Sequence, residues 1–284
     1  MYRTLGSFSR NFESGQTIQV WWRSHIHRHR GIQRGRAGMN RRKLLGLLGI
    51  TGISMLGRHS CATAGGEEIT RKMISCVVTP QQTEGPYFVD ERLHRSDIRS
   101  DPSDSSIKDG LPLALEIRVF TVGKGGADRC LPLANALVDI WHCDAQGIYS
   151  DVEDRNFNTV GKKFLRGYQV TDKNGGVRFI TIYPGWYPGR TVHIHFKIRT
   201  QPSGYTRGSE FTSQLYFDDA ITDKVHAHPP YAGYATKGSY QQRTRNEDDS
   251  IYLKGGKQLM LKLTEAEVGY ATTFDVGLEA EKRD

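Results

Sequence analysis

The feature that most constrains the fold is the strict alternation of apolar with polar or small residues between Leu111 and Val119. Leu113, Leu115 and Ile117 continue the apolar positions between these ends. Successive side chains of a β-strand point to opposite faces, whereas a helix repeats its apolar positions every three or four residues. The segment therefore predicts a strand with one buried and one open face.

Similar patterns predict further strands along the body of the chain. The expected strands lie at residues 136–141, 168–171, 177–182, 192–199 and 213–217. The turn sequence Asp172–Gly176 separates two of them, and we expect these two to form a hairpin-like pair. Helical periodicity is weak, with one or two expected helical turns near Leu263–Val268. Short strands, many turn residues and 31 glycines favour an all-β fold, an antiparallel β-sandwich with long loops and little helix.

Charge separates a basic leader from the rest of the chain. The 284 residues carry a formal net charge of +8, but residues 1–64 alone hold 11 Lys and Arg and a single acidic residue, Glu13. The remaining residues therefore hold slightly more acidic than basic side chains, which argues against a nucleic acid partner. No repeat or low-complexity linker divides residues 76–275, so we expect residues 65–284 to form one domain.

Residues 1–64 have the features of an export signal. Asn40-Arg41-Arg42-Lys43 places adjacent arginines directly before the apolar run Leu44–Leu56. This run is too short for a membrane span, which needs about 20 apolar residues, but it fits the apolar part of a signal peptide. Ala62-Thr63-Ala64 supplies small residues for cleavage. The pattern resembles a twin-arginine signal and predicts a periplasmic or extracellular protein with no stable membrane span after signal removal.

Two other interpretations of the leader stay open. A disordered basic arm with an incidental apolar patch would have the same composition. In addition, Met39 directly precedes the arginine motif, so translation from Met39 would leave residues 1–38 outside the protein.

Three cysteines, Cys76, Cys130 and Cys143, would remain after the leader is removed. An odd number allows at most one internal disulfide and leaves one thiol spare. Export permits a disulfide, but the sequence does not decide the pairing.

Two histidine triplets are candidate metal ligands. His193-Ile194-His195 lies in an expected strand, where residues two apart project from the same face, so both imidazoles could converge on one metal. His226-Ala227-His228 shows how common such a pattern is. It precedes two prolines and lacks strand alternation, so we assign it to a surface loop.

Two tyrosine-bearing segments flank the first triplet. Tyr183–Arg190 is rich in proline and glycine and predicts a constrained loop, and Asp139–Tyr149 predicts a strand end followed by a turn. Together with Thr83-Glu84-Gly85-Pro86-Tyr87 and Thr212–Phe217, these motifs follow one another in the order found in intradiol ring-cleavage dioxygenases. The chain resembles this family over about residues 74–220, and its exported members with a twin-arginine leader in particular.

The resemblance implies a mononuclear Fe(III) site with four protein ligands, Tyr149, Tyr187, His193 and His195. Ferric iron is a hard cation, and phenolate is a hard anionic donor whose pKa a bound metal lowers far below its ordinary value of about 10. Imidazole completes a mixed nitrogen and oxygen donor set.

The resemblance also implies an activity. The substrates would be O2 and a small catechol or polyphenol, the ring would open between its two hydroxylated carbons, and the products would be of the cis,cis-muconate type. Tyr187 would accept a proton as the catechol binds. Arg190 would stabilise negative charge on the substrate, Gln214 would contribute to the pocket, and Tyr87 would line it as an aromatic wall.

Two departures from the better-known members affect these expectations. Only residues 188–192 separate Tyr187 from His193, a shorter loop that we expect to leave the iron open to bulky or polyphenolic catechols. The long helical region through which catechol 1,2-dioxygenases dimerise is also absent, so we expect a monomer and no helical dimer.

Two alternatives keep the fold and change the function. The first is an exported, non-catalytic β-sandwich that binds polyphenols or carbohydrates. The second is a zinc hydrolase built on His193 and His195, although no third histidine or carboxylate stands at a suitable spacing.

Overall fold

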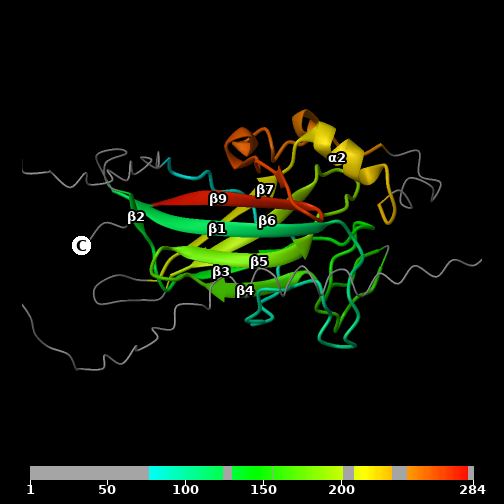
Figure 1. Ribbon diagram of the computed structural model, residues 1–284, viewed down its shortest axis with the longest axis horizontal. Coiled ribbons are helices and arrows are strands. Elements are labelled where there is room, and N and C mark those ends of the chain that lie inside the picture. The colour runs from blue at the N-terminus through cyan, green and yellow to red at the C-terminus, as the bar shows by residue number, and fades with distance from the viewer. Residues whose placement is uncertain (1–76, 124–129, 156, 201–207, 232–241, 281–284) are drawn as a thin grey trace, which may run out of the picture. The chain divides into compact units, whose positions relative to one another are not determined.

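The computed structural model describes residues 77–123, 130–155, 157–200, 208–231 and 242–280, which form two β-sheets (Figure 1). The five-stranded sheet contains β1 (Pro112–Val122), β2 (Cys130–Pro132), β5 (Gly176–Ile182), β8 (Thr264–Glu265) and β9 (Tyr270–Glu279). The four-stranded sheet has the order β4-β3-β6-β7, made of β4 (Arg166–Val170), β3 (Leu137–Trp141), β6 (His193–Arg199) and β7 (Glu210–Tyr216). Backbone contacts divide the chain into two units, Met1–Glu67 and Glu68–Asp284, and all of the described residues belong to the second unit.

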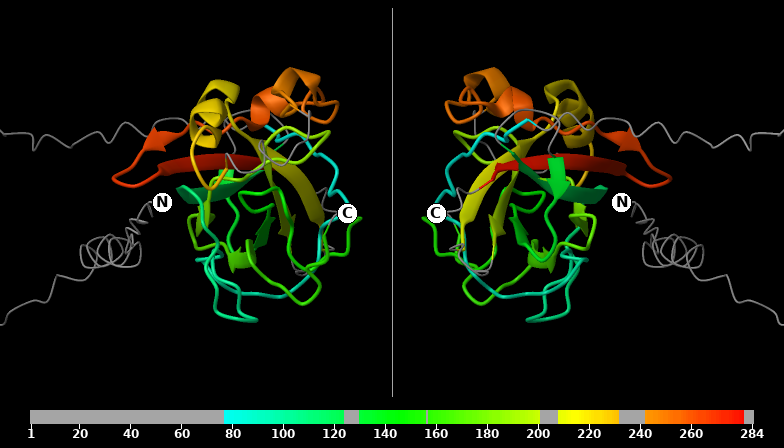
Figure 2. Two further views of the ribbon diagram at one scale, coloured as in Figure 1. Left: turned by 90° about the vertical axis from the view of Figure 1, so that its right-hand side faces the viewer. Right: turned by 90° about the vertical axis from the view of Figure 1, so that its left-hand side faces the viewer.

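The predicted all-β sandwich with little helix is confirmed. Side views show the strands of the two sheets as separate layers (Figure 2). All pairings between named strands are antiparallel except one: β1 runs parallel to β9, with Leu113 opposite Tyr270 and Val122 opposite Glu279. The sequence did not predict this parallel pair, because strand partners far apart in the chain leave no local signal.

The core lies between the sheets and follows from the alternation of each strand. Leu113, Leu115, Ile117 and Val119 of β1 point inward and are at most 1% exposed. They meet the inward side chains of β3 and β6, which are Val138, Ile140, Ile194, Phe196 and Ile198. Burial of these apolar surfaces supplies the main drive for folding.

Strand β6 is buried on both of its faces, which is unusual for a sheet that covers only one core. Ile194, Phe196 and Ile198 face the core between the sheets, so His193 and His195 must project from the opposite, outer face. That outer face is also buried, and both histidines are at most 2% exposed. The two histidines are thus held on a rigid strand beneath a cover of loops.

The expected hairpin around Asp172–Gly176 does not form. The strands on either side of this turn pair with different neighbours: β4 pairs with β3 and β5 pairs with β1. The turn itself is as expected, since the Asp172 carboxylate accepts the N–H groups of Asn174 (2.8 Å) and Gly176 (2.9 Å). It carries the chain from one sheet to the other, because each of the two strands has its apolar face turned to the shared core.

The helical prediction was wrong in position. Residues 264–265 form strand β8, which pairs with β9, and the α-helix among the described residues is α2 (Asp219–His226). Two short 3-10 helices, η2 (Asn246–Asp248) and η3 (Gly256–Leu259), follow it. Helix α2 buries only Thr222 and Val225, so its apolar stripe is too short to stand out in the sequence.

Cysteine pairing is partly settled. Cys130 is disulfide-bonded and Cys143 is a buried free thiol, while Cys76 lies outside the described residues. The predicted leader, residues 1–64, lies outside them as well. Within the described part of the chain, no helix has the length and apolar character needed to cross a bilayer.

Truncating a core side chain should test this packing. We expect Ile140→Ala, which empties a site 1% exposed between the sheets, to lower the free energy of unfolding by about 2–5 kcal/mol. Val170→Ala, at an exposed position near the end of β4, should change it by less than about 0.5 kcal/mol. Urea unfolding followed by tryptophan fluorescence measures both, and equal losses would contradict the assigned core.

Candidate metal and active site

A row of large polar and aromatic side chains crosses the outer face of the four-stranded sheet. Trp141 of β3 lies opposite His195 of β6, and His195 lies opposite Gln214 of β7. In the same way His193 lies opposite Tyr216. Residues directly opposite one another share a face of the sheet, so the register alone places these five side chains together. Trp141 stacks on His195 with ring centroids 4.9 Å apart and an angle of 6° between the planes.

Four potential donor atoms converge beside this row. His193 Nε2 and His195 Nε2 lie 3.0 Å apart. The hydroxyl oxygens of Tyr149 and Tyr187 lie 3.4 Å and 3.3 Å from His193 Nε2. The structure therefore brings together all four side chains that the sequence predicted as iron ligands, from three separate stretches of chain. Their assignment as metal ligands stays a prediction.

The two tyrosines reach the site because their loops pack backbone to backbone. Gly147, with a φ of +80°, lies so close to the loop of Tyr187 that a Cβ there would stand 2.1 Å from the carbonyl oxygen of Trp186. Gly185 approaches the first loop in turn, and its Cβ would stand 2.5 Å from the carbonyl oxygen of Asp144. Only glycine allows both approaches. Tyr149 and Tyr187 are thus held side by side, with ring centroids 5.7 Å apart.

Hydrogen bonding fixes the tautomer of His193. Its Nδ1 lies 2.6 Å from the carbonyl oxygen of Thr191, which can only accept, so Nδ1 carries the proton. In the neutral ring the lone pair then belongs to Nε2, the atom that faces His195 and the two phenols. An outer hydrogen bond of this kind orients metal-binding histidines in general.

Burial keeps all four groups neutral when no cation is present. It lowers the pKa of His193 to about 3 and, with the neighbouring His193, holds the pKa of His195 well below its usual range. It raises the pKa of the Tyr149 and Tyr187 hydroxyls above the ordinary value of a phenol. Four neutral donors in a dry pocket suit a highly charged cation, which would draw the protons off both phenols.

Arg190 approaches the donor cluster from the side of β7. Its Nε donates to Asp249 Oδ2 (2.9 Å), and its Nη2 donates to Gln214 Oε1. Gln214 is anchored in turn through Nε2, which donates to the Thr83 carbonyl oxygen (2.9 Å). Arg190 and Gln214, two predicted site residues, therefore touch one another.

Tyr87 forms a wall of the same site. Its ring stacks on Tyr149 with a centroid distance of 4.5 Å, and it meets Tyr187 edge-on at 6.2 Å. Its hydroxyl donates to Asp154 Oδ2 (3.0 Å), and burial together with this carboxylate raises the pKa of Tyr87 to about 12. The position fits the predicted aromatic lining.

Several residues of the site were missed by the sequence. Asp249, Trp141 and Tyr216 line it, and Arg166 donates to the carbonyl oxygens of Tyr87 and Ser150 behind Tyr149. Strand register could have found Trp141 and Tyr216, which lie opposite the two histidines. No local signal marks Asp249, because it reaches the site from a separate segment after η2.

The second histidine triplet makes none of the contacts of this cluster, and its assignment to a surface loop was wrong for one member. His226 ends helix α2, donates to the carbonyl oxygen of Pro184 (3.0 Å) and stacks on Tyr231. His228 is exposed. Among the described residues no group of three or more His, Cys, Asp and Glu side chains is placed to hold a metal, so the zinc alternative lacks a ligand set there.

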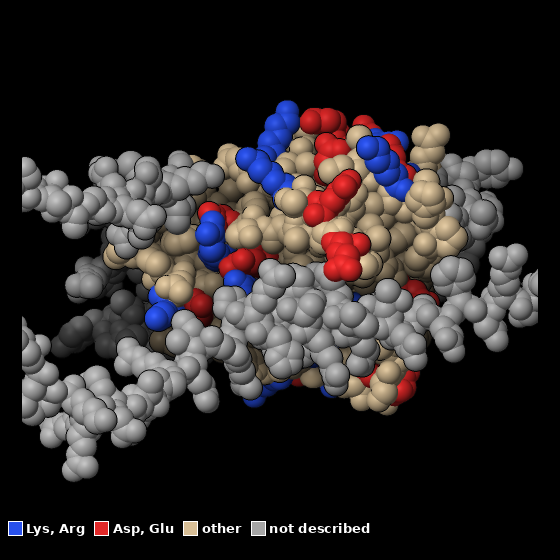
Figure 3. All heavy atoms as spheres, in the orientation of Figure 1, with Lys and Arg blue, Asp and Glu red and all other residues tan. Residues whose placement is uncertain are grey.

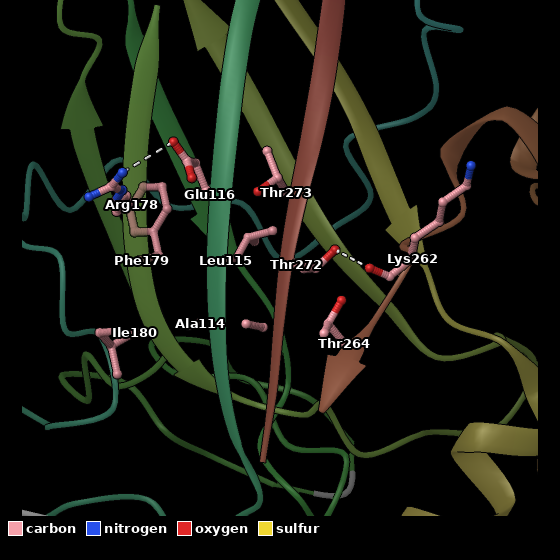
Figure 4. Close-up of a pocket in the computed structure, with 11 residues that line it drawn as sticks. Ala114, Leu115, Glu116, Arg178, Phe179, Ile180, Lys262, Thr264, Thr272 and Thr273 are labelled. Carbon is pink, nitrogen blue, oxygen red and sulfur yellow. Dashed lines mark hydrogen bonds and ion pairs between the residues drawn. The ribbon is translucent and has the colours of Figure 1, made fainter. Parts of the chain in front are cut away.

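A separate groove of about 430 Å³ lies on the outward face of the five-stranded sheet (Figure 4). Ala114 and Ala271 are among its lining residues, and Glu116 of β1 pairs with Arg178 of the neighbouring strand β5 at 3.6 Å. None of the four converging donors lines it. Figure 3 shows Lys, Arg, Asp and Glu side chains interspersed on the visible part of the face seen in Figure 1.

Comparison with known proteins identifies the family. Residues 83–246 match the model of a family described as Dioxygenase. The chain belongs to this family, the intradiol ring-cleavage dioxygenases, as the order of its motifs predicted. It is similar to the protocatechuate 3,4-dioxygenase beta chain of Burkholderia cepacia, with 31% identity over 156 residues that cover 52% of this chain and 63% of that one.

Other relatives carry related names. The catechol 1,2-dioxygenase of Acinetobacter baylyi is 34% identical over 119 residues, which cover 38% of this chain and 32% of that protein. The chain thus matches less than two thirds of the length of these curated relatives. Among solved structures, the intradiol ring-cleavage dioxygenase from Tetranychus urticae superposes with a TM-score of 0.59 at 28% identity, covering 74% of this chain and 98% of that one.

The buried histidines predict how stability depends on pH. Burial lowers the pKa of His142 from 6.5 to about 4 and that of His193 to about 3. Below about pH 6.5 these histidines bind protons in the unfolded chain but stay neutral in the folded chain. The free energy of unfolding of the metal-free protein should therefore decrease as the pH falls through this range. Urea unfolding at a series of pH values measures it. His142→Gln should flatten the dependence, and an unchanged slope would contradict this cause.

Proposed function

We propose that this protein is an Fe(III)-dependent intradiol dioxygenase that cleaves catechol rings with O2 between the hydroxylated carbons, giving products of the cis,cis-muconate type. The observation that carries the proposal is that the two phenol oxygens and His195 Nε2 all lie within 3.4 Å of His193 Nε2. Membership of the family supports the reaction class.

Tyr149, Tyr187, His193 and His195 would hold the iron. Two phenolates are hard anionic donors that suit a trivalent ion, and together with two neutral imidazoles they leave it one positive charge to share with substrate or hydroxide. Bound iron supplies a Lewis acid that lowers the pKa of coordinated oxygens and withdraws electrons from the catechol ring. Cys143 lies nearby, but its thiolate would suit a softer metal, and burial raises the pKa of its thiol.

The two tyrosines would differ in role because their surroundings differ. Tyr149 is 1% exposed and lies beneath the stacked ring of Tyr87, whereas Tyr187 is only partly buried and belongs to the loop before β6. We therefore assign proton movement to Tyr187: its hydroxyl oxygen would accept a proton from an incoming catechol. Tyr149 would stay in place as the fixed donor.

Arg190 would act on the substrate through its charge. A guanidinium stays protonated throughout, and two hydrogen bonds hold this one against the donor cluster. A fixed cation beside a ring that accumulates negative charge stabilises the transition state without reorganising. Gln214 would keep the guanidinium in place, and the ring of Tyr87 would guide the flat catechol into the pocket.

Cellular location and assembly complete the proposal. The twin-arginine pattern at Arg41-Arg42 supports export to the periplasm or the extracellular space, with the leader removed. Such a route carries folded proteins and would allow iron to be loaded before export. The protein would act as a monomer on small catechols or polyphenols.

Ligand substitutions should separate this function from that of a non-catalytic binding module. The iron-replete protein should be wine-red from charge transfer between phenolate and iron, with about one iron per chain. Tyr149→Phe and His195→Ala should each lower iron content about 10-fold or more. Elemental analysis and visible absorption measure both. Exposed His228→Ala serves as the control, and a colourless wild-type protein after iron loading would refute the proposal.

Arg190→Ala should keep the iron and lose turnover. Removing one preorganised charge from a transition state costs about 10²- to 10³-fold in kcat. Oxygen uptake with catechol, 4-methylcatechol, protocatechuate and a polyphenol should reveal the preferred substrate, and mass analysis should find muconates. Semialdehyde products would mean cleavage beside the hydroxyl groups and would contradict the intradiol assignment. Wild-type turnover in Arg190→Ala would contradict the role proposed for Arg190.

A further inference from the structure

We infer that Asp249 is a positioning residue that holds the Arg190 guanidinium in its working orientation. This inference rests on the proposed function, because it assigns a role within the same site. Asp249 lies directly after η2, just beyond the end of the family match at residue 246. No motif of the sequence pointed to it.

The Asp249 carboxylate is fixed from four directions. Its Oδ2 accepts Arg190 Nε and Thr191 N, both at 2.9 Å. Its Oδ1 accepts Ile251 N (2.8 Å) and Tyr252 N (3.2 Å). Its side chain is 1% exposed. Burial acts to raise the pKa of this carboxyl, but the Thr191 N–H and Arg190 outweigh it, so the pKa lies below its ordinary value and the group is charged.

The consequence concerns Arg190. Asp249 takes Nε and Gln214 takes Nη2, so two acceptors on different segments define the plane of the guanidinium and leave Nη1 uncommitted to either. A planar fork held at two points keeps its direction, whereas a single contact would allow it to swing. Asp249 therefore determines where the positive charge of Arg190 points.

Thr191 links the segment of Asp249 to His193. Asp249 holds the backbone N–H of Thr191, and the carbonyl oxygen of the same residue accepts the Nδ1 proton of His193. The Thr191 hydroxyl also donates to Asn246 Oδ1 (2.6 Å), so Asp249 and Asn246 each hold Thr191 through one hydrogen bond. The Asn246 contact keeps Thr191, and with it His193, in place when Asp249 is changed, so a substitution of Asp249 should act through Arg190.

A purely structural role is the alternative, since Oδ1 also caps the turn at residues 251–252. Asp249→Asn separates the two roles. Asparagine has one acceptor oxygen, so it can keep the turn while its amide faces the donors of Arg190 and Thr191. The matched control is Asp248→Asn, a change at the exposed neighbouring residue.

The decisive test is a double-mutant cycle with Arg190→Ala, measured as kcat and KM for catechol. We expect Asp249→Asn to lower kcat about 10- to 100-fold with KM and iron content little changed. In the Arg190→Ala background, Asp249→Asn should lower kcat by less than about twofold. A residue that acts through Arg190 has no guanidinium left to position there. Asp248→Asn should turn over like the wild type.

Two results would overturn the inference: wild-type kcat in Asp249→Asn, or an equal loss with and without Arg190. If Asp249→Asn fails to fold, Arg190→Lys tests the same claim, because an ammonium keeps the charge but cannot span Asp249 and Gln214 as a fork. Full turnover of Arg190→Lys would contradict it.

A crystal structure of Asp249→Asn gives a readout that needs no turnover. The Arg190 guanidinium should leave its present position while His193 and His195 keep theirs, and an unmoved guanidinium would count against the inference. A wild-type protein that binds iron but cleaves no catechol would refute the proposed function alone, and the crystal structure would still decide whether Asp249 holds Arg190.

Discussion

The separation of 3.0 Å between His193 Nε2 and His195 Nε2 is the interaction on which the candidate site depends. One of these nitrogens already lacks a proton, because Thr191 holds the proton of His193 at Nδ1. Both histidines are at most 2% exposed, so two such atoms so close together are stabilised by a shared proton or a shared cation. The strand fixes their spacing, and the loops above it bury them.

The loops over the outer face therefore serve the chemistry as much as the packing. They bring Tyr149 and Tyr187 to the histidines and exclude water, so that any charge in the pocket acts strongly. Arg166 shows that a charged group buried in this region needs hydrogen-bond partners. It is 3% exposed, and its guanidinium is satisfied by carbonyl oxygens of Tyr87 and Ser150 behind the site. The charge of Arg166, a second buried cation besides Arg190, favours the anionic form of Tyr149.

Local patterns predicted six of the described strands, because alternation is a property of each segment by itself, but they missed β2, β8 and β9. They also indicated that His193 and His195 share a face, which the fold confirms. They failed where partners lie far apart in the chain: the expected hairpin at Asp172–Gly176 instead joins two sheets, and β9 is an unforeseen neighbour of β1. Tyr149, Tyr187 and Arg190 came from motif order, whereas Asp249 had no motif and needed coordinates.

The parallel pair β1–β9 sets an order for assembly. Its partners, such as Leu113 and Tyr270, are separated by most of the domain, so β1 has an open edge until the last strand has been synthesised. Contacts of such long range form slowly. The four-stranded sheet uses only residues 137–216, and its histidines can be in register earlier. A chain cut short before β9 would thus hold the paired histidines in register while the edge of β1 is still free to pair with another strand.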